Sequence, residues 1–345
     1  MVEVLLKYGL EETAVIERIT GGLINETWKV SASSGVYILQ RINERIFTNP
    51  EDIAYNIRLV ANYLREQFPT YYFVSPLSTP DGRDIICIPE SGYYRLFNYV
   101  KDSHVNNVVT NRMQAYQASQ QFARFTQYLS GFDAKSLRIT IPHFHDLTLR
   151  YEQFCIALVN ANKERLSQSK ALIKVINTHE DIVSQYKQIT NNSGFKLRVM
   201  HHDTKISNVL FNSRDEGICV IDLDTIMPGY IISDVGDMMR TYLSPVNEEE
   251  SNFDKIQIRT SLYKAIVKGY TDGMDKSLFD IEKEHFFYAG KFMIYMQALR
   301  FLTDHLNDDK YYGVTYPGQN FVRAGNQLML LQRLMEKEDV LRKLI

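Results

Sequence analysis

Three side chains in one short stretch of the chain are of the types that phosphoryl transfer requires. Asp203 and Asn208 are separated by four residues, and Asp222 follows after two short apolar runs joined by the polar turn 212–217. Two apolar runs around a polar turn predict a β-hairpin, which returns to the end at which it began. Because Asn208 enters the hairpin and Asp222 leaves it, we expect both side chains at one mouth, with Asp203 on the approaching loop.

The oxygen atoms of this set suit a divalent cation. Mg²⁺ takes carboxylate and amide oxygens together with waters and substrate phosphates, so Asn208 and Asp222 are the predicted metal ligands. Asp203, kept off the metal, would accept a hydroxyl proton from the acceptor substrate. The kinase template divides the work in this way between a loop Asp and an Asn–Asp metal pair. The pattern therefore predicts phosphoryl transfer to an alcohol.

Each of these residues also has a plain structural interpretation. A lone Asp or Asn in a loop most often caps a turn or a helix, and it is the ordered set around an apolar hairpin that favours chemistry. His201 and His202 precede Asp203, but the chain has only 8 histidines and no H-x-x-H or H-x-x-x-H pair nearby. A zinc site is therefore not predicted, and His201 is expected to orient the loop of Asp203.

The first hundred residues predict a small antiparallel sheet with one helix. Alternating or β-branched runs separated by glycine or Pro-Asp-Gly turns predict strands over 15–19, 27–30, 36–42, 74–77, 85–88 and 93–100. Asn49 is a good N-cap and Pro50 suits a first helical position, so a helix is expected from there to Gln67.

From residue 101 onward the pattern is mainly helical. Apolar residues at helical spacing predict helices over 113–129, 151–158, 171–186, 256–270 and 285–306. The last of these is apolar on most sides and is expected to be buried, and the island 197–226 is rich in strands. The predicted fold class is α+β, with a sheet-containing N-terminal lobe over 1–100 and a larger helical C-terminal lobe over 101–345.

The composition excludes several classes of protein. At 345 residues the chain exceeds the ~250–300 residues of a usual single core, which favours two lobes. A formal net charge of −2 gives no overall basic surface for nucleic acid. No run approaches the ~18 apolar residues that span a membrane, and three dispersed cysteines favour a reducing compartment. We expect a cytoplasmic protein, and no protein partner is indicated.

The motifs HHDTKISN (201–208) and IDLD (221–224) resemble the aminoglycoside phosphotransferase and choline kinase superfamily. That superfamily has a bilobal, protein-kinase-like fold. Five further segments are similar to its N-acetylhexosamine 1-kinase branch: GGLINET (21–27), YILQRIN (37–43), DLDTIMPG (222–229), DVGDMMR (234–240) and RFLTD (300–304). The resemblance covers most of the chain and implies Mg-ATP between two lobes, with a small sugar as the substrate.

The resemblance also assigns roles to residues. It implies that Asp203 is the catalytic base, that Asn208 and Asp222 bind the metal, and that Asp224 is a second ligand or a loop anchor. It places nucleotide contacts at the glycine turn, on the strand after it and at the hinge, which gives Gly21, Gly22, Asn25, Gln40, Arg41, Asn98, Tyr99 and Val100.

One position departs from the kinase pattern. Gln40 stands where kinases have a strand lysine, with Arg41 next to it, and Tyr55 stands where the next helix normally offers a glutamate. A glutamine cannot neutralise phosphate charge as a lysine does. Either Arg41 or another cation substitutes, or Mg²⁺ carries more of the charge.

The acceptor would lie beside Asp203 in a pocket of the helical lobe. The candidates are Asp237, Arg240, Arg300, Asp304, Tyr311, Tyr312, Tyr316 and Arg323. Arg300 and Asp304 are four apart, however, and a surface ion pair on one helix explains them equally simply. These residues favour an N-acetylhexosamine as the acceptor. The alternatives are a kinase for an aminoglycoside, choline or homoserine, a nucleotide-binding module without catalysis, and, more remotely, a metallohydrolase.

Overall fold

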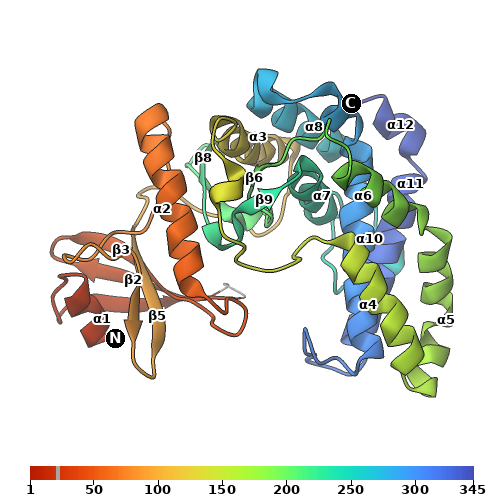
Figure 1. Cartoon of the computed structure of the whole chain (residues 1–345), viewed down its shortest axis with the longest axis horizontal. Coiled ribbons are helices and arrows are strands. Elements are labelled where there is room, and N and C mark those ends of the chain that lie inside the picture. The colour runs from red at the N-terminus through yellow and green to blue at the C-terminus, as the bar shows by residue number, and fades with distance from the viewer. Residues whose placement is uncertain (21–23) are drawn as a thin grey trace.

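The computed structural model describes residues 1–20 and 24–345, which form a sheet-containing lobe and a larger helical lobe (Figure 1). The smaller lobe holds a five-stranded antiparallel sheet in the order β1-β2-β3-β5-β4. Its strands are β1 (Val15–Ile19), β2 (Glu26–Ala32), β3 (Gly35–Arg41), β4 (Ile86–Ile88) and β5 (Gly92–Asn98). The predicted α+β class with two unequal lobes is confirmed.

The two faces of this sheet have different surroundings. One face packs against the short helix α1 (Val2–Lys7) through an apolar cluster of its own. Side chains alternate along a strand, and directly paired residues share a face. Thr27, Gln40 and Arg95 are paired in this way on β2, β3 and β5. Their side chains therefore lie together on the second face, which looks toward the helical lobe.

Helix α2 (Pro50–Gln67) begins at the predicted position but belongs to the core of the other lobe. Its apolar side joins the large cluster of the helical lobe and not the cluster of the sheet. The fully buried Asn56 donates to the carbonyl oxygens of Arg138 (2.8 Å) and Ile226 (3.0 Å), and it accepts the Arg138 N–H (2.8 Å). In Figure 1, α2 stands between the sheet and the helices of the larger lobe.

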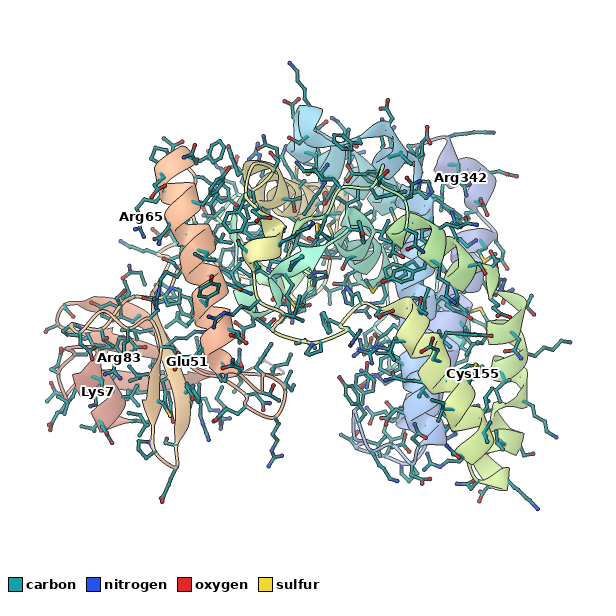
Figure 2. The ribbon with its side chains drawn as sticks, viewed as in Figure 1. Lys7, Glu51, Arg65, Arg83, Cys155 and Arg342 are labelled. Carbon is teal, nitrogen blue, oxygen red and sulfur yellow. The ribbon has the colours of Figure 1, made fainter. Side chains whose placement is uncertain are left out.

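The helical lobe is built around α10 (Phe286–Leu306), which is buried along nearly its whole length, as its apolar pattern predicts. Cys155 and Arg342, labelled in Figure 2, lie on the exposed surface of this lobe. None of the described helices is long and apolar enough to cross a membrane. The other helices are α3 (Arg112–Tyr128), α4 (Leu147–Asn160), α5 (Lys163–Thr178), α6 (Asp181–Thr190), α7 (Ile231–Tyr242), α8 (Thr260–Met274), α9 (Asp280–Glu284), α11 (Gln319–Met335) and α12 (Glu338–Arg342).

Two small antiparallel ribbons lie between α2 and α7 in Figure 1. The strands β7 (Val209–Phe211) and β8 (Gly217–Val220) form the predicted hairpin, while β6 (Arg198–Met200) pairs with β9 (Met227–Gly229). A 3-10 turn at 206–208 precedes β7, and another at 223–225 follows β8. Because β7 and β8 are antiparallel, the turn before β7 and the turn after β8 lie at the same end of this hairpin.

Two predicted elements differ from the structure. No strand forms over 74–77, because Pro76 has no N–H to donate to a ladder and only Leu77 bonds to the sheet, at the carbonyl oxygen of Leu96 (2.7 Å). The helix predicted over 171–186 is two helices, α5 and α6, which are separated at residues 179–180. Helices α7 and α11 were not predicted.

Candidate active site

The hairpin brings Asp203, Asn208 and Asp222 to one place. The side-chain amide of Asn208 donates to the Asp203 carboxylate at 3.0 Å and to the Asp203 carbonyl oxygen at 2.9 Å. The ammonium group of Lys205 lies 2.8 Å from the Asp203 carboxylate and 3.9 Å from the Asp222 carboxylate. One cation therefore joins the two acids, and the amide of Asn208 contacts the first of them.

The two acids have opposite pKa shifts. Burial alone would raise the pKa of Asp203, but Lys205 and the amide of Asn208 outweigh it and hold that pKa below its usual value. Burial and the charge of Asp224 raise the pKa of Asp222 to about 7, although Lys205 opposes the rise. Asp203 is therefore ionised at neutral pH, whereas Asp222 has too little positive charge around it. A carboxylate in that situation gains from a divalent cation.

The Asp203 loop is held by buried polar groups on both sides. Asp234 of α7 is fully buried and accepts the N–H groups of His201 (3.0 Å) and His202 (2.8 Å). The His201 ring accepts the Asp203 N–H (3.3 Å), and its other nitrogen lies 2.9 Å from the carbonyl oxygen of Ile221. His201 thus links the loops of both acids, and its expected orienting role is confirmed.

A second acid of α7 supports the same loop. Asp237 accepts the Thr204 N–H (2.9 Å) and pairs with Arg240 (3.0 Å), which also pairs with Glu248 (3.0 Å). The structure therefore places Asp237 and Arg240, two predicted acceptor residues, in contacts that hold the loop of Asp203. Both are largely enclosed, with side chains 6% and 18% exposed.

A chain of rings runs from this loop toward α4. His202 has left-handed backbone (φ 65°), and its ring lies so close to Gly229 that a Cβ there would be 2.5 Å away. The Ser233 hydroxyl contacts both His202 and His145, and the His145 ring stacks on Phe144 with centroids 4.3 Å apart. Burial lowers the pKa of both histidines, that of His202 to about 4, so both rings are neutral at physiological pH.

The donor set fits magnesium. In residues 1–20 and 24–345, no three His, Cys, Asp or Glu side chains gather as a metal cage. Mg²⁺ does not need such a cage, because it keeps waters and substrate phosphates as ligands beside one or two protein groups. Asp222 would be one such group. The side-chain oxygen of Asn208 would be the other, because the amide nitrogen is committed to Asp203.

Asp224 is held by the sheet lobe. Asn25 donates to one of its carboxylate oxygens (2.7 Å), and Arg95 forms an ion pair with the other. Asn25 also accepts the backbone N–H of Asn43 (3.0 Å), so it is fixed on both sides. Both oxygens of Asp224 are thus used in contacts between the lobes, which favours the loop-anchor interpretation of Asp224 over metal ligation.

A cation does lie beside Gln40, and it is Arg95. Two nitrogens of the Arg95 guanidinium donate to the Gln40 side-chain oxygen, at 3.0 and 2.8 Å. Arg41 points to the other face of the sheet and pairs with Glu26 (3.2 Å) at a half-exposed position. Of the two cations that the sequence analysis considered, Arg41 and another residue, it is therefore the other residue that lies beside Gln40.

Of the predicted hinge residues, Asn98 is the last residue of β5, and Tyr99 and Val100 follow it. The Tyr99 N–H donates to the carbonyl oxygen of Val36 (3.0 Å), which continues the pairing one residue beyond Asn98. The hydroxyl of Ser103 donates to the carbonyl oxygen of Val100 (2.6 Å). Gly21 and Gly22 of the predicted phosphate turn lie outside the described residues.

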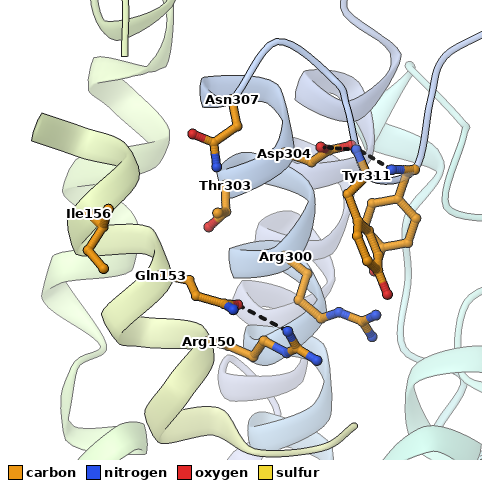
Figure 3. Close-up of a pocket in the computed structure, with 9 residues that line it drawn as sticks. Arg150, Gln153, Ile156, Arg300, Thr303, Asp304, Asn307 and Tyr311 are labelled. Atoms are coloured by element: carbon orange, nitrogen blue, oxygen red, sulfur yellow. Dashed lines mark hydrogen bonds between the residues drawn. The ribbon is translucent and has the colours of Figure 1, made fainter. Parts of the chain in front are cut away.

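A cavity of about 290 Å³ opens between α4 and α10. Arg150 and Arg300 point into the same space from these two helices (Figure 3). The Arg300 guanidinium lies 5.4 Å from the ring centre of Tyr312 and 5.8 Å from that of Phe144, which joins the cavity to the chain of rings described above. The lining residues are Arg150, Gln153, Ile156, Arg300, Thr303, Asp304, Asn307, Tyr311 and Tyr312.

The two arginines of this cavity have no carboxylate partner among the described side chains. Arg150 donates to the Gln153 side chain and to the carbonyl oxygen of His143, both at 3.0 Å, and its Nε has no partner. Arg300 donates to Gln297 at 3.2 Å. Burial, together with the charge of Arg300, lowers the pKa of Arg150. Both guanidinium groups are thus available to a ligand.

The acid in the cavity wall is already committed. Asp304 is 4% exposed, and it accepts the backbone N–H groups of Tyr311 (2.7 Å) and Tyr312 (2.9 Å) and the side-chain amide of Asn320 (3.0 Å). It fixes the loop that carries the two tyrosines and forms no ion pair with Arg300 in the described part of the chain. The cavity therefore has an excess of positive charge.

Sequence reasoning did not single out Lys205, Arg95 or Arg150. Lys205 lies inside the HHDTKISN motif, two positions after Asp203, so the sequence alone could have indicated a cation close to that acid. Arg95 can be identified as a site residue only from the strand register that pairs it with Gln40. Arg150 can be identified only from the packing of α4 beside α10.

Comparison with known proteins places this chain among phosphotransferases, in agreement with the phosphoryl-transfer residues that the structure brings together. A model of the "Phosphotransferase enzyme family" matches residues 15–275. The structure is similar to an aminoglycoside phosphotransferase from Alicyclobacillus acidocaldarius subsp. acidocaldarius DSM 446, with 14% identity, 97% of this chain and 95% of that chain covered, and a TM-score of 0.62. It is also similar to a spectinomycin phosphotransferase solved with ADP and spectinomycin. The identity is 11%, the match covers 97% of this chain and 97% of that chain, and the TM-score is 0.61. A third similar structure is a choline kinase from Cryptosporidium parvum Iowa II. The identity is 14%, the match covers 98% of this chain and 96% of that chain, and the TM-score is 0.58.

Proposed function

The chain belongs to the phosphotransferase enzyme family, and we propose that it transfers the γ-phosphoryl group of ATP to the anomeric hydroxyl of an N-acetylhexosamine. The convergence of Asp203, Asn208 and Asp222 around Lys205 carries this proposal. The choice of a sugar rests on the resemblance of several segments to N-acetylhexosamine 1-kinases and on the chemistry of the cavity. N-acetylglucosamine and N-acetylgalactosamine are the proposed acceptors.

Each residue then has a distinct task. Asp203, ionised at neutral pH, accepts the proton of the anomeric hydroxyl while the hydroxyl oxygen forms a bond to the γ-phosphorus of ATP. The bond between the γ-phosphorus and the oxygen that bridges it to the β-phosphorus breaks, and ADP is released. Lys205 lies between the two acids, where it attracts the transferred group. Mg²⁺ would be held by Asp222 and Asn208 and would neutralise charge on the phosphates. Positioning and charge neutralisation supply the catalysis, without a covalent enzyme intermediate.

The charge of the cavity favours a neutral acceptor over a cationic one. Choline and aminoglycosides carry positive charge, which the unpaired guanidinium groups of Arg150 and Arg300 would repel. An N-acetylhexosamine is neutral and offers hydroxyl and carbonyl oxygens to those donors. A volume of about 290 Å³ lies near the ~300 Å³ lower limit of ligand pockets, which suits one sugar ring.

We also propose a cytoplasmic location for this reaction. ATP as the donor and small molecules as the other reactants require no further protein partner. The cysteines Cys87, Cys155 and Cys219 are all free, as a reducing compartment allows.

A substrate panel tests the acceptor. The purified protein is incubated with Mg-ATP and, separately, N-acetylglucosamine, N-acetylgalactosamine, choline and an aminoglycoside, and the products are followed by ³¹P NMR. We expect a sugar 1-phosphate from at least one hexosamine, and none when EDTA removes the metal.

The possible outcomes separate the parts of the proposal. Phosphorylation of choline or the aminoglycoside but of neither sugar would refute the acceptor and leave phosphoryl transfer intact. ATP binding without transfer to any compound would favour a nucleotide-binding module. The Asp254→Asn variant, altered at an exposed aspartate far along the chain, should match the unchanged protein and serves as the control.

A further inference from the structure

Arg95 is a buried cation on the face of the sheet that looks toward the helical lobe. It lies on β5 directly opposite Gln40 of β3, and its side chain is only 3% exposed. One edge of its guanidinium donates to the Gln40 oxygen and the other pairs with Asp224. Burial of a charged group is costly, and the ion pair with Asp224 together with the Gln40 oxygen offsets that cost.

Arg95 also fixes which way the Gln40 amide faces. Because the Gln40 oxygen accepts two N–H groups from Arg95, its NH₂ group must point away from Arg95. The amide nitrogen lies 3.3 Å from the hydroxyl of Thr27 on β2, the strand that follows the glycine turn. Its second proton has no partner among the described residues. The Gln40 amide is thus a neutral hydrogen-bond donor whose orientation is fixed by the Arg95 guanidinium.

The same cation also holds the segment that carries Asp222. Its ion-pair partner, Asp224, is two residues along the chain from Asp222. Arg95 therefore connects Gln40 of the sheet to the segment on which Asp222 lies.

We propose that Arg95 is the positioning cation of the nucleotide phosphates, and that it replaces the missing strand lysine through Gln40. Arg95 orients the Gln40 amide toward the phosphates and supplies positive charge behind it, while Asp224 holds Arg95 in place. Asp224 then acts as the anchor of this cation and not as a ligand of Mg²⁺. The inference rests on the proposed function only in taking Mg-ATP as the donor.

Binding of Mg-ATP and of adenosine, measured by calorimetry, tests the role of Arg95. Adenosine has no phosphate, so loss of a phosphate-positioning cation should weaken Mg-ATP and leave adenosine unchanged. Charge-assisted contacts predict about 10- to 100-fold weaker Mg-ATP binding in Arg95→Met, with partial recovery in Arg95→Lys. Arg65→Met, altered at an exposed arginine in the last turn of α2, should bind both ligands normally.

A second variant guards against misfolding. Arg95→Met alone leaves the buried Asp224 carboxylate without its cation, whereas Arg95→Met combined with Asp224→Asn removes both charges. The double variant should bind adenosine normally and Mg-ATP about 10- to 100-fold more weakly. Equal weakening of both ligands in it, or unchanged Mg-ATP binding, would overturn the inference. If the unaltered protein binds adenosine but not Mg-ATP, it is the proposed function that fails.

Discussion

Replacement of Asp234 with asparagine tests how the loop of Asp203 is held. Asp234 is fully buried and accepts the N–H groups of His201 and His202. Burial, helped by the charges of Asp237 and Asp203, raises its pKa from 3.8 to about 7, although the two N–H donors oppose the rise. The folded protein therefore holds this proton more tightly than the unfolded chain. The stability that Asp234 contributes is fully present below about pH 4 and is lost as the pH rises through about 7.

The size of the effect follows from the two pKa values. The difference between 3.8 and about 7 corresponds to ~4 kcal/mol, and about 2–3 kcal/mol of it falls between pH 5 and pH 8. Asparagine does not titrate. We therefore expect the free energy of unfolding to fall by about 2–3 kcal/mol more in the unaltered protein than in Asp234→Asn across this interval.

Urea unfolding followed by circular dichroism at pH 5, 6, 7 and 8 measures this difference. At pH 5 the variant should itself be less stable by about 1–3 kcal/mol, because the NH₂ group of asparagine faces one of the two N–H donors. Asp254→Asn, which alters an exposed carboxylate, should follow the pH profile of the unaltered protein. Parallel profiles for the unaltered protein and Asp234→Asn would refute the reasoning.

Three further changes test the other parts of the site. Asp203→Asn should lower kcat by about 10²- to 10⁴-fold and leave the Kd of Mg-ATP nearly unchanged; turnover close to normal in a steady-state assay would remove Asp203 as the base. Arg300→Gln should raise the KM of the sugar by about 10-fold or more with the KM of ATP unchanged, and an equal rise in both would indicate a structural role. Gly229→Ala would place a methyl group 2.5 Å from the His202 ring, so it should lower kcat and reduce stability by about 1–3 kcal/mol, and unaltered kcat and Tm would contradict that packing.

The parts of the site that the sequence predicts are those set by neighbours in the chain. The hairpin follows from two apolar runs and a polar turn, so the meeting of Asn208 and Asp222 could be expected. Arg95 could not, because its role depends on the pairing of β3 with β5, strands that are far apart in the chain. Arg150 depends in the same way on the packing of two helices from distant segments.

Local pattern also failed where a single residue overrides it. Residues 74–77 read as a strand, but Pro76 cannot donate to a ladder. Helix α7 was not predicted, although Ile231, Val235, Met238 and Tyr242 recur at helical spacing within it. Its buried side also includes Asp234 and Asp237, which accept backbone N–H groups of the Asp203 loop. That these acids face inward depends on contacts with a distant segment, which a local pattern does not contain.

The attachment of α2 to the helical lobe limits how this enzyme could be regulated. In protein kinases, activity is controlled by the placement of the helix that follows the lysine-bearing strand. Here that helix contributes its apolar side to the core of the large lobe, and Asn56 ties it to backbone groups at Arg138 and Ile226. A swing of α2 would break all of these contacts at once. We therefore expect α2 to remain with the large lobe when the sheet changes its position.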